Sequence, residues 1–62
     1  ERAVEGLMRA LSDDDRRVRE QAAWALGAIG EPRALPGLLP ALKDPEASVR
    51  RQAAWAIGVI GR

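Results

Sequence analysis

The sequence predicts an all-α fold, an α-solenoid of four helices arranged as two repeats, and three observations lead to it. The chain of 62 residues repeats itself, because 17 of the 31 pairs formed by residues 1–31 and 32–62 are identical without a gap. Apolar residues recur at helical spacing, and no segment alternates with the period of two that is typical of strands. Both copies are rich in alanine, the best helix former. We expect one module, residues 1–62, made of repeat one (1–31) and repeat two (32–62).

The apolar residues of each repeat fall on two helical stripes. In the first half of each repeat they recur at i, i+1, i+4, i+5 and i+8, the spacing of one helix face. These residues are Ala3, Val4, Leu7, Met8 and Leu11, and then Ala34, Leu35, Leu38, Leu39 and Leu42. The stripes of the second halves are Val18, Ala22, Ala25, Leu26 and Ile29, and Val49, Ala53, Ala56, Ile57 and Ile60. Each repeat is therefore predicted to be a pair of helices.

Acidic residues separate the two helices of each repeat. Short polar side chains cap helix N-termini, and negative charge is favourable there. We expect Asp15 to cap the second helix of repeat one and Glu46, a less apt residue, to take the same place in repeat two. The acidic run Asp13–Asp15 is interpreted as capping rather than as a cation site, because Pro45 interrupts the second copy.

Glycine and proline mark the other helix boundaries. Gly30 and Gly61 follow the last apolar residue of each second helix, where a left-handed residue is expected. Pro32 suits the first position of the third helix. Pro36 and Pro40 each remove a backbone hydrogen bond, so this helix is predicted to be kinked or shortened.

Two further glycines lie inside the second helices. Gly27 and Gly58 each cost about 1 kcal/mol of helix stability relative to alanine. We interpret both as places where a neighbouring helix approaches closely.

The composition excludes several kinds of site. The chain contains no cysteine and no histidine, so it has no disulfide, no thiolate or imidazole metal ligand and no nucleophile–histidine pair. We expect no enzyme activity, no cofactor and no metal. The net charge of +1 argues against nucleic acid as the main partner. The sequence shows no apolar run near the roughly 20 residues of a membrane span and no signal peptide. Together with the absence of cysteine, this favours a cytoplasmic protein.

Both copies resemble the HEAT-like repeat of the phycobilin lyase (PBS lyase) type, and they are similar to the artificial alpha-repeat scaffolds idealised from it. The resemblance rests on Leu-x-Asp-x-x-x-x-Val-Arg followed by Ala-Ala-Trp-Ala-Leu/Ile-Gly-x-Ile-Gly. These patterns span residues 11–19 and 22–30 in repeat one, and 42–50 and 53–61 in repeat two. The resemblance implies a right-handed superhelical stack with the first helices in the convex layer and the second helices in the concave layer. Partners of such proteins usually bind on the concave face.

The resemblance also implies a structural role for four charged residues. In HEAT repeats an aspartate and an arginine at this spacing help to form a ladder between neighbouring repeats. The matching residues are Asp13 and Arg19 in repeat one, and Asp44 and Arg50 in repeat two. We expect these residues to stabilise the stack rather than to bind a ligand.

Both tryptophans are predicted to lie opposite the buried stripes. At about 100° per residue, Trp24 falls roughly 180–200° from the centre of its stripe, and Trp55 has the same place in the fourth helix. Because packed helices lie about 8–10 Å apart, the two indoles are expected to form an exposed strip that binds a partner. The predicted members of this strip are Trp24, Trp55, Arg17, Gln21, Arg51, Gln52, Ala28 and Val59. The alternative interpretation is that each indole packs along the surface of its own helix.

The predicted function is that of a non-enzymatic scaffold module for protein–protein interaction, including self-association. Each repeat of a solenoid buries its flank against a neighbour, so two repeats leave both flanks open. We expect a homo-oligomer formed by end-to-end stacking or by helix exchange, and the two whole repeats indicate an excised fragment or an engineered minimal unit. Two alternatives stay open: nucleic-acid binding on the concave basic and aromatic face, and an accessory repeat segment of a lyase-type enzyme.

Overall fold

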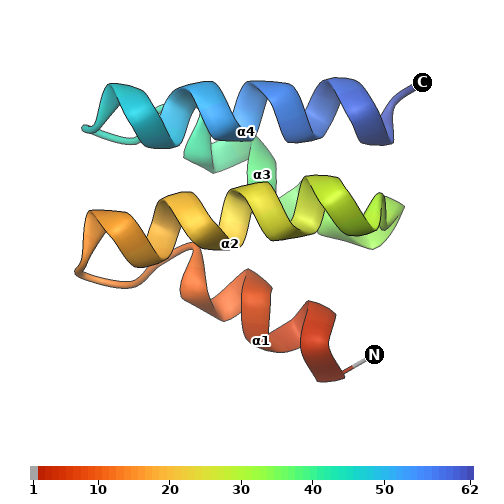
Figure 1. Cartoon of the computed structure of the whole chain (residues 1–62), viewed down its shortest axis with the longest axis horizontal. Coiled ribbons are helices and arrows are strands. Elements are labelled where there is room, and N and C mark those ends of the chain that lie inside the picture. The colour runs from red at the N-terminus through yellow and green to blue at the C-terminus, as the bar shows by residue number, and fades with distance from the viewer. Residues whose placement is uncertain (1) are drawn as a thin grey trace.

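In the computed structural model, which describes residues 2–62, the chain forms four α-helices and one short 3-10 helix (Figure 1). In chain order these are α1 (Arg2–Ala10), α2 (Arg16–Ile29), η1 (Pro32–Ala34), α3 (Leu35–Ala41) and α4 (Ala47–Ile60). No strand occurs in the described residues. The all-α prediction and its four helices are confirmed.

The second helices hold the two repeats together. α2 and α4 run side by side in the same direction, and their contact is the most extensive between any two helices (Figure 1). α1 packs against α2, and α3 packs against α4. Each first helix thus supports the second helix of its own repeat, as in an α-solenoid.

The N-terminal caps of the second helices are as predicted. Asp15 has an extended backbone, and its Oδ1 accepts a hydrogen bond from the N–H of Arg17 at 2.8 Å. Glu46 takes the N-cap position of α4 without a side-chain hydrogen bond, in keeping with the poorer capping ability of glutamate. Asp13 and Asp44 order the preceding loops, because each accepts the N–H of the residue two positions later, at 2.8 and 2.9 Å.

The C-terminal caps of the second helices differ from each other. Gly30 is left-handed, with φ 72°, as predicted, and its N–H donates to the carbonyl of Leu26. The same prediction for Gly61 is wrong, because its φ of −80° and ψ of −1° keep it right-handed. Gly30 turns the chain toward η1, whereas the backbone at Gly61 continues in a right-handed conformation.

Proline shortens the third helix, as predicted, and also changes its first turn. α3 has seven residues, against nine in α1. Pro36 has no N–H to donate to the carbonyl of Pro32, which accepts the N–H of Leu35 instead. This bond spans three residues rather than four, so Pro32 begins a 3-10 turn and not the α-helix that was predicted to start there.

The core consists of aliphatic side chains between the helix pairs, many of them small. Leu26, Leu38 and Val49 are the largest side chains that are fully buried. The other buried apolar residues are Val4, Leu11, Ala22, Ala23, Ala34, Ala41, Ala53 and Ala56. The stripe predicted for α2 is wrong at its two ends, because Val18 and Ile29 are 37% and 51% exposed.

Candidate functional site

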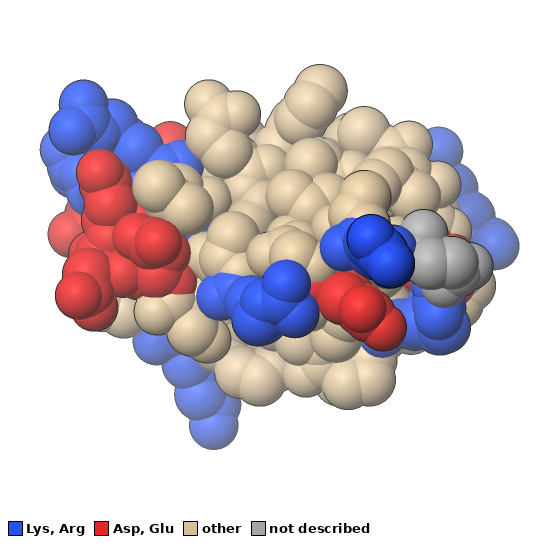
Figure 2. Space-filling model, turned by 90° about the horizontal axis from the view of Figure 1, so that it is seen from below, with Lys and Arg blue, Asp and Glu red and all other residues tan. Residues whose placement is uncertain are grey.

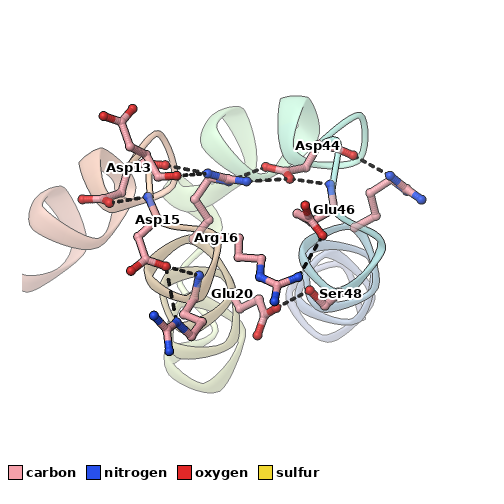
Figure 3. Close-up of polar contacts among 11 residues, drawn as sticks. Asp13, Asp15, Arg16, Glu20, Asp44, Glu46 and Ser48 are labelled. Atoms are coloured by element: carbon pink, nitrogen blue, oxygen red, sulfur yellow. Dashed lines mark hydrogen bonds and ion pairs between the residues drawn. The ribbon is translucent and has the colours of Figure 1, made fainter.

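A bidentate ion pair joins the two repeats at the start of the second helices (Figure 3). Arg19 of α2 donates from Nε to Asp44 Oδ2 at 2.7 Å, and from Nη2 to Asp44 Oδ1 at 3.2 Å. Its Nη1 donates to the carbonyls of Asp13 and Asp14, at 2.7 and 3.0 Å. One guanidinium therefore holds the loop of its own repeat and the loop of the next repeat. We call the pair of Arg19 and Asp44 the inter-repeat rung.

The rung is largely shielded from water, since the side chains of Arg19 and Asp44 are only 13% and 8% exposed. Burial of the Asp44 carboxyl opposes its ionisation, but hydrogen bonds from Arg19 and from the N–H of Glu46 outweigh this effect. The pKa of Asp44 therefore lies below its ordinary value. The hydrogen bond to Asp44 in turn raises the pKa of Arg19. Both groups stay ionised at neutral pH, and charge-assisted bidentate pairs of this kind are strong and directional.

Two further polar contacts cross between the repeats, and neither was predicted from the sequence (Figure 3). Arg16 pairs with Glu46 at 3.3 Å, and the hydroxyl of Ser48 donates to Glu20. Neither Arg16 nor Glu20 recurs at the equivalent position of repeat two. The repeated pattern therefore does not indicate these contacts. The opposite charges of Arg16 and Glu46 are the sequence feature that could have indicated the first of them.

α2 and α4 approach each other closely at Gly27, near the C-terminal end of α2. A Cβ atom on Gly27 would lie 2.5 Å from the ring of Trp55 and 2.8 Å from the Cα atom of Ala56. No side chain fits there, which confirms the predicted close approach. The same prediction for Gly58 is wrong for this structure. A Cβ atom there would meet no atom within 4 Å, because no helix of the described chain lies on that side of α4.

Both tryptophans lie at the surface, but their surroundings differ. The exposed fractions are 53% for Trp24 and 42% for Trp55. The ring of Trp55 lies against Gly27 of the preceding repeat, whereas no repeat of the described chain precedes Trp24. Trp24 lines a shallow depression of about 320 Å³ together with Glu20, Gln21 and Gln52.

The other residues predicted for the partner-binding strip lie on the same two helices. Arg17, Gln21, Ala28 and Arg51 are exposed, and Gln52 and Val59 are partly buried. The structure brings Gln21 and Gln52 together with Trp24 around the depression. Arg17 is instead turned toward the cap of its own helix, 3.6 Å from Asp15. That this strip binds a partner stays a prediction.

Equivalent residues of the two repeats differ in burial where only one of them has a neighbour. Ala23 faces repeat two and is fully buried, whereas its counterpart Ala54 is exposed. In the other direction, Val49 is fully buried and its counterpart Val18 is 37% exposed. We call the outer side around Val18 the N-terminal flank, and the outer side around Ala54 and Gly58 the C-terminal flank. Both flanks are uncovered copies of the surfaces that meet inside the chain.

Each flank carries one half of a rung. Arg50 on the C-terminal flank donates from Nη1 to the carbonyl of Asp44 at 2.6 Å, as Arg19 does to Asp13, but it meets no carboxylate within residues 2–62. Asp13 on the N-terminal flank is exposed, and its carboxylate accepts the N–H of Asp15. Figure 2 shows this flank, with a broad uncharged area, a row of basic and acidic side chains along one side of it, and acidic side chains gathered beside basic ones at the end where the loops lie. Of the four predicted ladder residues, two are thus brought together and two face outward.

The described part of the chain offers open surfaces at its two flanks and along the tryptophan strip. Within residues 2–62 no three acidic side chains converge in a way that could hold a metal ion. No helix in that range is both long and apolar enough to span a bilayer. The carboxylates of lowered pKa serve the architecture: Asp15, whose pKa is lowered by the N–H of Arg17, caps α2, and Asp44 forms the rung.

Repeated helix pairs that stack so that each repeat packs against its neighbour define an α-solenoid protein. The family model described as HEAT repeats matches residues 1–58, and the chain belongs to this family. The prediction of a HEAT-like repeat protein is thereby confirmed. A comparison with curated proteins finds no match. HEAT repeats commonly mediate protein–protein contacts and generally act as scaffolds rather than as enzymes.

Proposed function

We propose that this chain is a protein-interaction scaffold that associates with further copies of itself by stacking through its open flanks. The difference in burial between equivalent residues carries the proposal. Leu11 is 7% exposed where repeat two covers it, and its counterpart Leu42 is 40% exposed. The flanks thus present side chains that the repeat buries whenever a neighbour is available.

The physical gain from stacking is the burial of these apolar side chains. Apolar surface removed from water contributes about 25 cal/mol per Å². Each repeat of a solenoid contacts only its nearest neighbours, so the stability of an array rises with every interface formed. Within the described residues one such interface is formed, mainly between α2 and α4. Association supplies more of the same contact.

The strip of Trp24 and Trp55 is a second surface, which we assign to a different protein partner. Both indoles are well exposed, and amide side chains surround the depression beside Trp24. Tryptophan amid polar groups that can donate and accept hydrogen bonds is typical of binding hot spots. Trp55 stays 42% exposed although repeat one lies beside it, so stacking through the flanks extends the strip rather than covers it.

The relation to the PBS lyase type and to artificial alpha-repeat scaffolds, including an engineered origin, belongs to the same proposal. It is supported by the agreement of the two copies at 17 of 31 positions. Arrays of near-identical consensus repeats are unusually designable.

Size-exclusion chromatography with light scattering tests self-association, over chain concentrations from about 1 µM to about 1 mM. We expect the mean mass to rise above 6.7 kDa with concentration. Stacking continues beyond two copies, whereas helix exchange closes as a dimer. A mass of 6.7 kDa at every concentration would refute the proposed function.

A further inference from the structure

The charges and shapes of the two flanks determine which flanks meet when copies associate, an inference that rests on the proposed function. We propose that the C-terminal flank of one copy receives the N-terminal flank of a second copy. In this arrangement α4 packs against the second copy's α2 in the way that α2 packs against α4 within the chain.

Gly58 is the first feature that selects this arrangement. Inside the chain, the space left by the missing side chain of Gly27 is filled by Trp55 and Ala56 of the next repeat. Gly58 has the same position in its repeat, and the space beside it is open. The residue of a second copy that corresponds to Trp55 is Trp24. A helical glycine with nothing against it weakens α4, whereas the same glycine beneath an incoming indole permits the close approach.

Arg50 and Asp13 supply the second feature. Arg19 presents Nε and Nη2 to the carboxylate of Asp44 across the internal contact. Arg50 is already oriented in the same way toward its own loop, through its Nη1 bond to a carbonyl. In the proposed arrangement the exposed carboxylate of Asp13 from the second copy takes the place of Asp44 and completes a rung. Arg50 lies in the first turn of α4 and Gly58 near its end, so these contacts hold the incoming helix at two separate points.

If the second helices of two copies run parallel, as α2 and α4 do within the chain, the other ways of pairing the flanks bring like charges together. Two C-terminal flanks would bring Arg50 and Arg51 of each copy against each other. Two N-terminal flanks would bring two acidic loops, residues 13–15, into contact. Like charges that are brought together across an interface disfavour it, which leaves the pairing of unlike flanks as the favoured arrangement. When the C-terminal flank of one copy meets the N-terminal flank of another, basic residues face acidic residues. This head-to-tail pairing does not close on itself and therefore builds an open chain of copies.

Two internal contacts are not reproduced at the junction between copies. The residues that correspond there to the ion pair of Arg16 and Glu46 are Ala47 of the first copy and Asp15 of the second, which cannot pair. Inside the chain Ser48 donates to Glu20. The residues that correspond to them at the junction are Arg17 of the second copy and Arg51 of the first, which are both basic. We therefore expect the junction to be weaker than the contact inside the chain, and the assembly to be reversible.

Gly58→Ala tests the arrangement, because it should strengthen the single chain and weaken its association. Sedimentation velocity on the full chain gives the dissociation constant between copies, which should rise about tenfold or more in the variant. Thermal unfolding in dilute solution should give a higher midpoint than wild type, since alanine favours the helix. An unchanged dissociation constant would overturn the arrangement and leave the proposed function standing. A wild-type chain that stays monomeric would overturn both.

Asp13→Asn, compared with Asp14→Asn, tests the rung between copies. Both variants remove one negative charge, and an asparagine at position 13 can still accept the N–H of Asp15. The side chain of Asp14 makes no such contact within the described residues. We expect Asp13→Asn to weaken association about two- to fivefold, as for the loss of one partly exposed ion pair, and Asp14→Asn to leave it unchanged. Equal effects of the two variants would refute the rung.

Discussion

Replacing Gly27 with alanine is expected to destabilise the protein, although alanine is the better helix former. A Cβ atom on Gly27 would lie 2.5 Å from the ring of Trp55 and 2.8 Å from Cα of Ala56. The indole can rotate away, but the Cα atom belongs to the backbone of α4. α2 and α4 must therefore move apart to admit one methyl group, and a closely packed interface resists this movement.

The magnitude follows from two opposing contributions. Replacing glycine by alanine inside a helix stabilises it by about 1 kcal/mol, whereas overpacking costs about 1–3 kcal/mol. The backbone clash places Gly27→Ala at the upper end of that cost, which leaves a net loss of about 1–2 kcal/mol. Gly58→Ala meets no atom within 4 Å and keeps the whole gain of about 1 kcal/mol. The same change at equivalent positions of the two repeats is thus expected to have opposite signs.

Thermal unfolding followed by far-ultraviolet circular dichroism measures both variants, in solutions dilute enough that copies do not associate. In a chain of this size, about 1 kcal/mol corresponds to roughly 4–8 °C in Tm. We expect the order Gly58→Ala, wild type, Gly27→Ala from highest to lowest Tm. The two variants should differ by roughly 10 °C or more. A Tm of Gly27→Ala at or above that of wild type would refute the close contact between α2 and α4.

Three other predictions follow from burial, ionisation and exposure. Leu38→Ala removes a fully buried side chain and should cost about 2–5 kcal/mol of a total stability of about 3–9 kcal/mol. Leu39→Ala, at a 53% exposed position, should cost under about 1 kcal/mol in the same urea titration, and equal costs would contradict the assigned core. Because folding lowers the pKa of Asp44 from 3.8, its stabilisation is present above that unfolded value and is lost as the pH falls through the folded value. The Tm of the wild type should therefore stay nearly constant from neutral pH down to about 4. Below that pH it should fall more steeply than the Tm of Asp44→Asn, and parallel curves of Tm against pH would contradict this. Iodide should quench the fluorescence of Trp55→Phe, in which only Trp24 emits, more strongly than that of Trp24→Phe. The reason is that Trp24 is 53% exposed and Trp55 is 42% exposed. The reverse order of quenching would contradict this difference in exposure.

Structural features that depend only on residues close together in the sequence could be predicted. Asp15 caps α2 through a backbone N–H two residues later, and Gly30 turns the chain that immediately follows it. The shortening of the third helix followed in the same way from proline. The 3-10 turn was missed because it depends on which N–H the carbonyl of Pro32 accepts once Pro36 can offer none. That choice is made by the geometry of the turn and not by helix propensity.

Identical residues did not imply identical surroundings. Gly27 and Gly58 occupy the same repeat position, yet one lies beneath an indole and the other faces open space. Trp24 and Trp55 differ in exposure for a related reason. Whether another helix lies alongside depends on where a repeat stands in the stack, and the residues of the repeat do not encode this. The contacts of Arg16 with Glu46 and of Ser48 with Glu20 were missed for a different reason, because Arg16 and Glu20 have no like counterpart in repeat two.

The rung and the glycine contact lie at opposite ends of α2, with Arg19 in its first turns and Gly27 in its last. The first holds the loops of two repeats at a fixed separation, while the second lets the other ends of the helices come together. A difference between the two separations would incline neighbouring repeats, and in a longer array such angles add up from one repeat to the next. The size of the residue at position 27 would then affect the curvature of that array. It would change the radius of the surface that carries the tryptophans without altering any residue on that surface.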